Sequence, residues 1–525
     1  MGNRFCKILC CVILCVALAA GCGSVSELSF DAMQTGSEGE EMTTLGLTPE
    51  FDYEVPESLP GILVDQVGYA RQSDKMAFFL GEQLPDYFSV VDAESGQVVY
   101  TGKIKQRETD GSTDSDISYG EFTSLETAGN YYIQADRIGR SYTFEIAENP
   151  YTELYYAGLK KYYFNRCGLT LSSELAGDAA RNACHSREAQ LVNDAEVKLD
   201  VSGGWHVDEA GSRDVSEGCT ASNYLMIAYE LYPEVFDDQV GIPESGNEIP
   251  DVLDEVKYEI DWLLKMQDAA SGAVYSGVSS VDNQSGGYLL YVKKPDMNGT
   301  IQFAATLAKF SYLYQNYDRA YATQCLQAAD RAYRYAGKYP EDITPEEYFH
   351  AAAELYRASG GYGYHNVVKN YLTENLIADM ENDFVFWGCL TYMSTRQKVD
   401  VNLCGDVMKI LMQEGERIAE ASRESGLLVN VEGDPDNGAD LMHDIMRLAV
   451  VDHVITNHEY ATVLQNHLHY MLGRNRQSVS YLDNSGSRNY KDIDNSRGIM
   501  NQIDLNAELV LMMSAIEEEL EGTAE

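Results

Sequence analysis

The segment from Asp200 to Asp214 holds side chains that could take part in chemistry. It reads Asp-Val-Ser-Gly-Gly-Trp-His-Val-Asp-Glu-Ala-Gly-Ser-Arg-Asp, so Trp205 and His206 precede three carboxylates. These are Asp208, Glu209 and Asp214. A carboxylate can activate a water molecule, and a protonated carboxyl can donate a proton. The same three acids could equally be solvated side chains of a surface loop.

A second group of side chains suits a metal ion. Cys167, Cys184, His185 and His206 form a plausible Cys2His2 set. Zinc prefers thiolate and imidazole ligands in a tetrahedron, and a full set of four protein ligands indicates a structural rather than a catalytic site. The alternatives are a disulfide between Cys167 and Cys184 or two buried thiols. Four other cysteines lie in helical stretches, where we expect them to be core residues: Cys219, Cys325, Cys389 and Cys404.

The elements that must position these side chains are mainly helical. From Tyr151 onward, apolar residues recur at helical spacing and predict about twelve helices. In the stretch Ile249 to Met266, Pro250 and three acids occupy the start, as at a helix N-terminus, and the apolar residues form one stripe. About twelve consecutive helices fit an (α/α)6 barrel, and they also fit an α-solenoid.

The residues before Tyr151 have a different texture. From Gly61 to about Asn149, short apolar or alternating runs are separated by turn residues, which predicts a small β-sandwich. We therefore place a sandwich domain at residues 59–149 and a helical domain at residues 150–525. The sandwich itself shows no residues that suggest chemistry, so we expect it to pack against the helical domain.

The N-terminus is typical of a targeting signal. Arg4 and Lys7 precede the apolar run Ile8 to Ala20, which is too short for a confident membrane span and ends in small residues. The sequence Leu-Ala-Ala-Gly-Cys22 looks like a bacterial lipoprotein lipobox. We predict a signal peptide at residues 1–21, lipidation of Cys22, and a flexible tether at residues 22–58 rich in Ser, Gly, Thr and Glu. The alternative is a plain secretory signal.

This reading predicts an extracytoplasmic protein that a lipid anchor alone holds to the cell membrane. The several acyl chains of a bacterial lipoprotein should anchor it durably. The charge balance disfavours nucleic acid and anionic membrane surfaces as partners. The chain has 38 Lys and Arg against 83 Asp and Glu, a net charge of −45, which should repel nucleic acid and anionic lipid head groups. Neutral glycans are not repelled.

Several long motifs resemble glycoside hydrolase family 9, the inverting endoglucanases, in its branch with an N-terminal immunoglobulin-like domain. Besides the segment around Trp205, they are Gly61-Ile-Leu-Val-Asp-Gln-Val-Gly-Tyr69, Ile242-Pro-Glu-Ser-Gly-Asn-Glu-Ile-Pro-Asp251, Trp262-Leu-Leu-Lys-Met-Gln267, Glu347-Tyr-Phe-His-Ala-Ala-Ala-Glu-Leu-Tyr356 and Leu468-His-Tyr-Met-Leu-Gly-Arg-Asn475. The resemblance implies a mainly α fold, an (α/α)6 barrel preceded by a small immunoglobulin-like β-sandwich. It also implies a structural zinc on the Cys2His2 set and no organic cofactor.

The chain departs from the family at both catalytic carboxylates. The family's base is the second Asp of an Asp-Ala-Gly-Asp motif, and its place falls on Ala210, Gly211 or Ser212 depending on the register. The family's acid lies seven residues before the Ala of an Asn-Ala pair. That place falls on Met500, whose thioether cannot donate a proton.

The resemblance still implies candidates for each role. Asp208 and Asp214 are the candidates for the base. An Asp in the loop after Arg488, either Asp492 or Asp494, could act as a relocated acid. We expect sugar contacts from Trp205, Tyr481 and Arg488.

The resulting prediction is a lipid-anchored hydrolase that cleaves O-glycosidic bonds in β-glucan or a related plant polysaccharide, inverting if active. Its partner would be a polysaccharide or oligosaccharide. The alternative is a catalytically inactive, glycan-binding surface lipoprotein on the same fold. A purely structural surface protein is a third hypothesis, and we favour it least because an open barrel end is a natural ligand cleft.

Overall fold

The computed structural model describes residues 59–81, 83–106, 117–282, 287–375, 380–430, 438–455, 460–482, 485–488 and 498–524. The predicted signal peptide, Cys22 and the tether to residue 58 lie outside the described residues, as do Asp492 and Asp494. Within the described ranges, the helices are too short or too polar to cross a membrane.

The N-terminal domain consists of two sheets. One has the order β1 (Ile62–Leu63), β3 (Met76–Leu80), β7 (Ile117–Glu121) and β6 (Lys105–Gln106). The other has the order β2 (Gly68–Ala70), β10 (Phe144–Ala147), β8 (Gly129–Ala135), β4 (Tyr87–Asp92) and β5 (Val98–Lys103), with β9 (Gly139–Arg140) beside β8. Alternate residues of the strands point inward. Residues of both sheets share one core, where the rings of Phe79 and Phe88 lie 5.3 Å apart.

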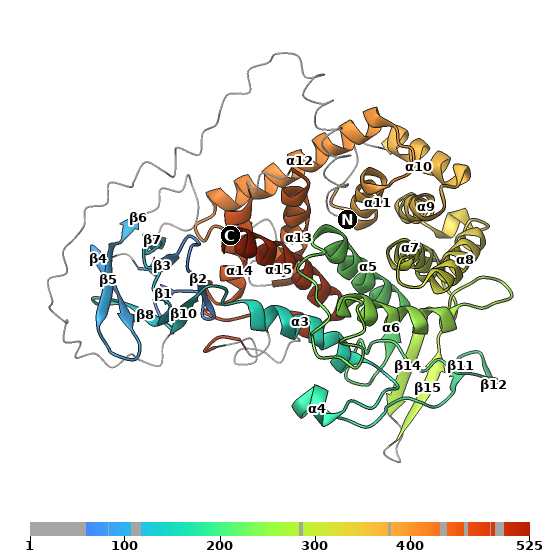
Figure 1. Cartoon of the computed structure of the whole chain (residues 1–525), viewed down its shortest axis with the longest axis horizontal. Helices are drawn as coiled ribbons and strands as arrows, with labels where there is room; N and C mark the ends of the chain where they lie inside the picture. The colour runs from blue at the N-terminus through green and yellow to red at the C-terminus, as the bar shows by residue number, and fades with distance from the viewer. Residues whose placement is uncertain are drawn as a thin grey trace.

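The remainder of the described chain is mainly helical (Figure 1). Its helices are α3 (Thr152–Asn165), α4 (Ser173–Ala176), α5 (Val215–Leu231), α6 (Asp251–Met266), α7 (Met297–Tyr314), α8 (Arg319–Ala336), α9 (Pro345–Ser359), α10 (Tyr362–Asn375), α11 (Asp383–Ser394), α12 (Val401–Glu424), α13 (Gly438–Ile455), α14 (Ala461–Met471) and α15 (Ile503–Ala524). Short 3-10 turns lie at η1 (Gly177–Ala179), η2 (Pro340–Asp342) and η4 (Ile499–Asn501). The prediction of a helix-rich domain that follows a sheet domain is confirmed.

Alternate helices form an inner layer. Helix α5 packs against α7 and α15, α7 against α9, α9 against α11, and α13 against α15. The helices between them in sequence pack outside, with α6 on α5, α8 on α7, α10 on α9, and α12 and α14 on α13. The inner helices bury nearly every face. In α5 the residues from Ala221 to Ala228 are all buried, which explains why its apolar pattern has little periodicity.

Helix α6 shows how the sequence specifies an outer helix. Pro250 precedes its first residue, Asp251 and Asp254 lie in the first turn, and the apolar stripe is buried. Proline at a helix start loses no hydrogen bond, and acids there interact favourably with the helix dipole. The predicted start at Ile249 was two residues too early.

A sheet that the sequence pattern did not predict lies beside the helices. Its strand order is β12 (Asp194–Leu199), β11 (Ala189–Leu191), β15 (Tyr288–Val292), β14 (Gly277–Asp282) and β13 (Arg213–Asp214). Strands β11 and β15 pair in parallel although about a hundred residues separate them. The pairing of β13 with β14 fixes the end of the segment Asp200 to Asp214.

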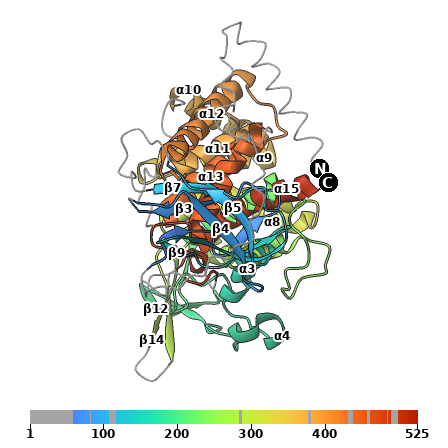
Figure 2. The same ribbon diagram turned by 90° about the vertical axis from the view of Figure 1, so that its left-hand side faces the viewer.

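The sandwich packs against the helical domain through two motifs that are far apart in sequence. The Asp65 Oδ2 and His469 Nδ1 atoms are hydrogen-bonded at 2.8 Å, and Gln66 Nε2 donates to the carbonyl of Ser478 at 2.8 Å. A Cβ on Gly473 would lie 2.4 Å from Gln66 Nε2, so only glycine fits there. Figure 2 views the molecule with the sandwich strands in front. The expected packing role of the sandwich is therefore observed.

Candidate active site and metal centre

The structure brings the four predicted zinc ligands together. Cys167 follows α3, Cys184 and His185 lie in the loop before β11, and His206 follows the bridge between Arg166 and Trp205. One ligand atom from each residue lies within 4.8 Å of the others. The Cys184 Sγ and His206 Nε2 atoms are 3.4 Å apart. Both thiols are free, so the alternative of a disulfide is not observed.

The arrangement fits a zinc ion by the chemistry of its donors. Two thiols and two imidazoles are a complete set for a closed tetrahedral site. The Nδ1 atom of His185 is buried and has no hydrogen-bond partner among the described residues, while its Nε2 atom contacts Ser280 Oγ at 3.1 Å. A hydrogen bond between the thiols lowers the pKa of Cys184 far below its ordinary value and raises that of Cys167. One thiolate is therefore already favoured.

Gly211 and Arg213 support the same cluster from the segment Asp200 to Asp214. A Cβ on Gly211 would lie 2.1 Å from His185 Cε1, and its φ of +80° also favours glycine. Arg213 is fully buried and its Nη1 atom lies 2.6 Å from Cys167 Sγ. Gly211 and Arg213 therefore pack directly against the predicted zinc ligands.

The three acids of the segment differ in their surroundings. Asp214 is the N-cap of α5, where it accepts a hydrogen bond from the Ser216 N–H at 3.0 Å. Its carboxylate also lies 3.0 Å from Lys293 Nζ and stays 25% exposed. Asp208 accepts the Ser212 N–H at 2.8 Å within a tight turn, and Glu209 is exposed. Asp214 therefore has a structural role whatever else it does.

The predicted sugar-binding residues are largely enclosed. Trp205 is 1% exposed, packs against Tyr162, and donates its backbone N–H to Glu259 Oε2 at 2.7 Å. Tyr481 is 7% exposed. Arg488 is partly buried, and its Nη1 atom donates to the Gln477 carbonyl at 3.2 Å. Their assignment to substrate binding stays a prediction. Trp205 in particular is a core residue in this conformation.

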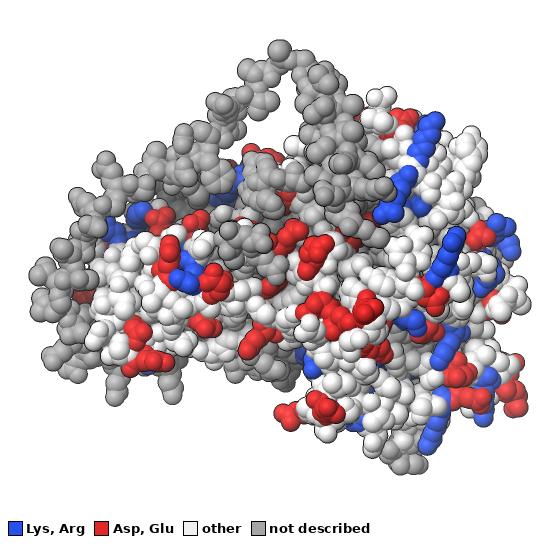
Figure 3. All heavy atoms as spheres, in the orientation of Figure 1, with Lys and Arg blue, Asp and Glu red and all other residues white. Residues whose placement is uncertain are grey.

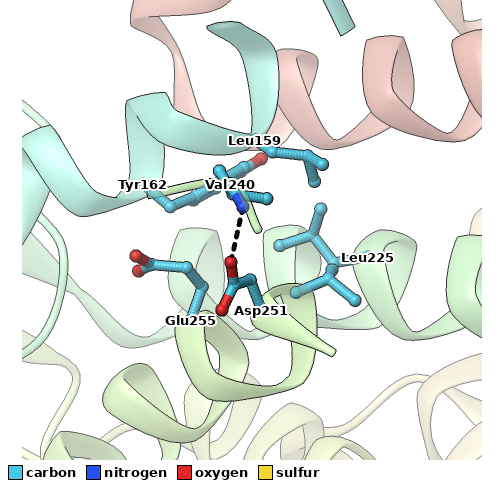
Figure 4. Close-up of a pocket in the computed structure, with 7 residues that line it drawn as sticks. Leu159, Tyr162, Leu225, Val240, Asp251 and Glu255 are labelled. Atoms are coloured by element: carbon cyan, nitrogen blue, oxygen red, sulfur yellow. Dashed lines mark hydrogen bonds between the residues drawn. The ribbon is translucent and has the colours of Figure 1, made fainter. Parts of the chain in front are cut away.

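Buried acids around Trp205 form a further feature that the sequence reasoning missed. Arg166 pairs with Glu244 and Glu255 at 2.9 and 3.0 Å. Figure 4 shows Glu255 beside a small pocket between α3, α5 and α6 that has no room for a water molecule. Burial raises the pKa of Glu255 to about 7 although Arg166 lowers it. The signal in the sequence was Glu255 and Glu259 on the apolar side of α6.

At the expected place of the acid, Met500 lies in η4 and is 1% exposed. Two further acids lie on inner helices. Glu508 of α15 is 6% exposed and Asp383 begins α11. The sequence reasoning did not select either residue. The available signal was a carboxylate, Glu508, within the apolar run Ala507 to Met513 of a buried helix.

Comparison with known proteins identifies the family. The model of glycosyl hydrolase family 9 matches residues 151–503, and that of the cellulase N-terminal Ig-like domain matches residues 57–140. The chain belongs to glycosyl hydrolase family 9. This family 9 chain is 28% identical to a cellodextrinase of Butyrivibrio fibrisolvens, over 82% of the chain and 86% of the relative. It is 27% identical to endoglucanase D of Acetivibrio thermocellus, over 81% of the chain and 73% of the relative.

Solved structures share the fold of this family 9 chain. The structure described as Bacteroides ovatus GH9 superposes with a TM-score of 0.77 at 21% identity, over 88% of the chain and 99% of that structure. A metagenome-derived family 9 endoglucanase superposes equally well, at 24% identity over 87% of the chain and 98% of that structure. The immunoglobulin-like nature of the N-terminal sheets is thereby confirmed together with the helical fold.

Proposed function

We propose that this chain hydrolyses O-glycosidic bonds in β-glucan or a related plant polysaccharide. The observation that carries the proposal is the family match over residues 151–503, which covers the whole inner layer up to the start of α15. Its curated relatives include a cellodextrinase and an endoglucanase. The alternation of inner and outer helices supports an (α/α)6 barrel, whose open end is a natural place for a glycan chain.

The surface charge is compatible with such a substrate. Figure 3 shows Asp and Glu spread over one face of the molecule, with Lys and Arg mainly toward its right-hand edge. A chain of net charge −45 repels polyanions such as nucleic acid. A neutral polysaccharide carries no charge that this field would oppose, so the charge favours neutral glycans over anionic partners.

Inverting hydrolysis needs one carboxylate to activate water and one carboxyl to protonate the leaving oxygen. Within the segment Asp200 to Asp214, the sequence offers Asp208 and Asp214 as candidates for the base. Asp214 lies at the N-terminus of an inner helix and is partly exposed, so it can cap α5 and still face a substrate.

The test combines a substrate panel with variants matched for their structural effect. The mature protein is incubated with glucans, xylans and mannans while new reducing ends and binding are followed. Asp214→Asn keeps an oxygen that can cap α5, because Asn and Asp are similarly good N-caps. A base at Asp214 therefore predicts lost activity with a nearly unchanged melting temperature. Glu209→Gln, at an exposed neighbour, is the control. Full activity in both Asp214→Asn and Asp208→Asn would show that neither residue is the general base.

A second candidate function is glycan binding without hydrolysis. The observation that favours it is the buried Met500 at the place of the family's acid. In this case the protein would present oligosaccharide to other proteins at the cell surface. Binding of a glycan from the panel without release of reducing ends would support this function over hydrolysis.

We also propose that Cys167, Cys184, His185 and His206 hold a structural zinc ion. The ion would fasten the segment around Trp205 to the end of α3. Metal analysis of purified protein should find about one zinc per chain, as a closed four-ligand site requires. Cys167→Ser should lose the metal and lower the melting temperature. Cys325→Ser, at another buried cysteine, is the control for the loss of a buried thiol. A metal-free protein whose melting temperature Cys167→Ser leaves unchanged would exclude the zinc site.

The location proposed for the protein follows from its N-terminus alone. We propose that Cys22 is acylated and that the protein is anchored outside the cytoplasm. Metabolic labelling with palmitate should label the chain, and Cys22→Ala should abolish both labelling and membrane fractionation. Secretion without any label would instead support a plain signal peptide.

A further inference from the structure

Five polar side chains from four inner helices meet inside the helical domain. We call Tyr224 of α5, Asp383 of α11, His443 and Arg447 of α13, and Glu508 of α15 the polar centre. These helices surround the middle of the helical domain in Figure 1. Asp383, His443 and Glu508 each lie within the first six residues of their helices, which is less than two turns. The centre therefore lies toward the N-terminal ends of inner helices, the same helix end that carries Asp214 on α5.

Within the polar centre, Asp383 pairs with a buried guanidinium. Its Oδ1 atom lies 2.9 Å from Arg447 Nη2, and the Tyr224 hydroxyl donates to its Oδ2 atom at 3.3 Å. The Arg447 side chain is only 1% exposed. A buried guanidinium is always charged and needs an anionic partner, and Asp383 lies in that position.

Glu508 has the opposite environment. Its side chain is 7% exposed, and its neighbours on α15, Ala507 and Leu509, are fully buried. Its Oε2 atom has no hydrogen-bond partner among the described residues, and the nearest basic atom that pairs with it is His443 Nδ1 at 3.9 Å. Burial, followed by the charges of Asp383 and Asp504, raises the pKa of Glu508 well above its ordinary value, against a smaller effect of Arg447.

His443 separates the two carboxyl groups. Asp383 lies 3.4 Å from its Nε2 atom, while Glu508 faces its Nδ1 atom. The side chains of His443 and Asp383 are 36% and 28% exposed, so the polar centre is open to solvent on the side of Asp383. A carboxylate paired with an arginine, beside a second carboxyl that is buried and lacks a partner for one oxygen among the described residues, is an arrangement that suits acid–base catalysis.

We propose that Asp383 and Glu508 are the general base and the general acid of this chain, acting on a glycosidic bond bound at the polar centre. This inference rests on the proposed hydrolytic function. It assigns the base to Asp383 in place of the two candidates in the segment Asp200 to Asp214, so it predicts that Asp208→Asn and Asp214→Asn stay active. Asp383 removes a proton from a water molecule, whose oxygen forms a bond to the anomeric carbon. The bond from that carbon to the bridging oxygen breaks, and Glu508 gives its proton to the departing oxygen. Water is consumed, one new reducing end forms, and the anomeric configuration inverts.

A purely structural role explains Asp383 and Arg447 but not Glu508. Arg447 also donates to the Met380 carbonyl at 3.1 Å, so it ties the start of α11 to α13. Glu508 contributes no hydrogen bond through Oε2, and an unsatisfied buried carboxyl oxygen is destabilising. An apolar residue in its place would then stabilise the fold, as expected where a residue is present for function rather than for packing.

The experiment measures hydrolysis, binding and stability in parallel. The full mature protein is assayed on the glycan that the panel identifies, with Glu508→Gln, Asp383→Asn and the control Glu518→Gln, a partly exposed acid on α15 that lies 3.8 Å from His453. A second substitution, Glu508→Leu, serves the stability measurement. We expect kcat to fall about 10²- to 10⁴-fold in Glu508→Gln, the usual contribution of a general acid. Binding of the oligosaccharide and the melting temperature should stay close to wild type, and Glu508→Leu should melt no lower than the wild type.

The pH dependence adds a readout that a structural role would not move. Activity of the wild type should fall on the alkaline side, at a pH above the ordinary carboxyl range, as Glu508 loses its proton. Hydrolysis by the wild type with kcat retained in Glu508→Gln overturns this inference and leaves the proposed function intact. If the wild type binds a glycan and cleaves none, both the inference and the hydrolytic function are overturned.

Discussion

The carboxyl group of Glu259 gives a quantitative test of the structure around Trp205. It is 1% exposed, and the one hydrogen bond described for it comes from the Trp205 N–H. A Cβ on Gly218 would lie 2.2 Å from its Oε1 atom, so the side chain fills its space closely. Burial raises the pKa of Glu259 from 4.5 to about 8, although Trp205 and Arg213 lower it. The native protein should therefore keep this carboxyl protonated at neutral pH.

The sign of the pH dependence follows from this raised pKa. Below pH 4.5 the carboxyl is protonated in both the folded and the unfolded chain, and its contribution to stability is fully present. Between pH 4.5 and pH 8 only the folded chain binds the proton, so the free energy of unfolding falls by about 1.4 kcal/mol per pH unit. Between pH 5 and pH 7 the loss is about 2.7 kcal/mol. Above pH 8 this contribution stays constant.

Glu259→Gln removes the titration and keeps an oxygen for the Trp205 N–H. Urea unfolding of the wild type and the variant, measured from pH 5 to pH 8, gives the difference in free energy of unfolding at each pH. From pH 5 to pH 7 the free energy of unfolding of the wild type should fall by about 2.7 kcal/mol more than that of Glu259→Gln. Glu420→Gln, at an exposed acid of α12, should run parallel to the wild type. Parallel curves for Glu259→Gln as well would show that the buried carboxyl is not protonated.

Two further predictions concern single contacts. Gly211→Ala should lower the melting temperature and the zinc content, because its Cβ would lie 2.1 Å from His185 Cε1. Gly246 also has a positive φ but has open space for a Cβ, so Gly246→Ala measures the backbone strain alone. Equal losses of melting temperature in the two variants would refute the clash with His185. Glu354→Gln should lower the free energy of unfolding by about 3–5 kcal/mol in urea unfolding, because it leaves the fully buried Arg357 with one anionic partner fewer. A loss below about 1 kcal/mol would show that the remaining partner suffices.

Much of the fold could be predicted because its signals are local. The stripe of α6 repeats every three to four residues, and the N-terminal strands alternate, so each segment shows its own element type. The four residues of the proposed zinc site were predicted from their residue types and from the family resemblance, because few side chains other than Cys and His suit zinc. The sheet from β11 to β15 was not predicted. Its strands are short, and their partners lie up to about a hundred residues away, so no local pattern distinguishes them from loops.

The candidate acids show the limit of the same reasoning. Asp214 was selected for its place in a motif, and the structure adds that it caps α5 and pairs with Lys293. Glu508 and His443 were not selected, because neither belongs to a motif that singles it out from the other polar residues of its helix. Their proximity depends on which faces of α13 and α15 turn toward each other. Sequence spacing within one helix carries no information about that packing.

The sequence by itself determined the family, the two kinds of domain, the four residues of the proposed zinc site and the absence of a carboxylate at the positions where the resemblance places the family's base and acid. These features depend on residue identity and on spacing along one segment. The tertiary structure alone decided that Trp205 is buried, that Gly211 packs on His185, and that Asp383, His443 and Glu508 share one centre. Burial and charge environment arise from contacts between distant segments, so the protonation state of a carboxyl is decided only when the chain has folded.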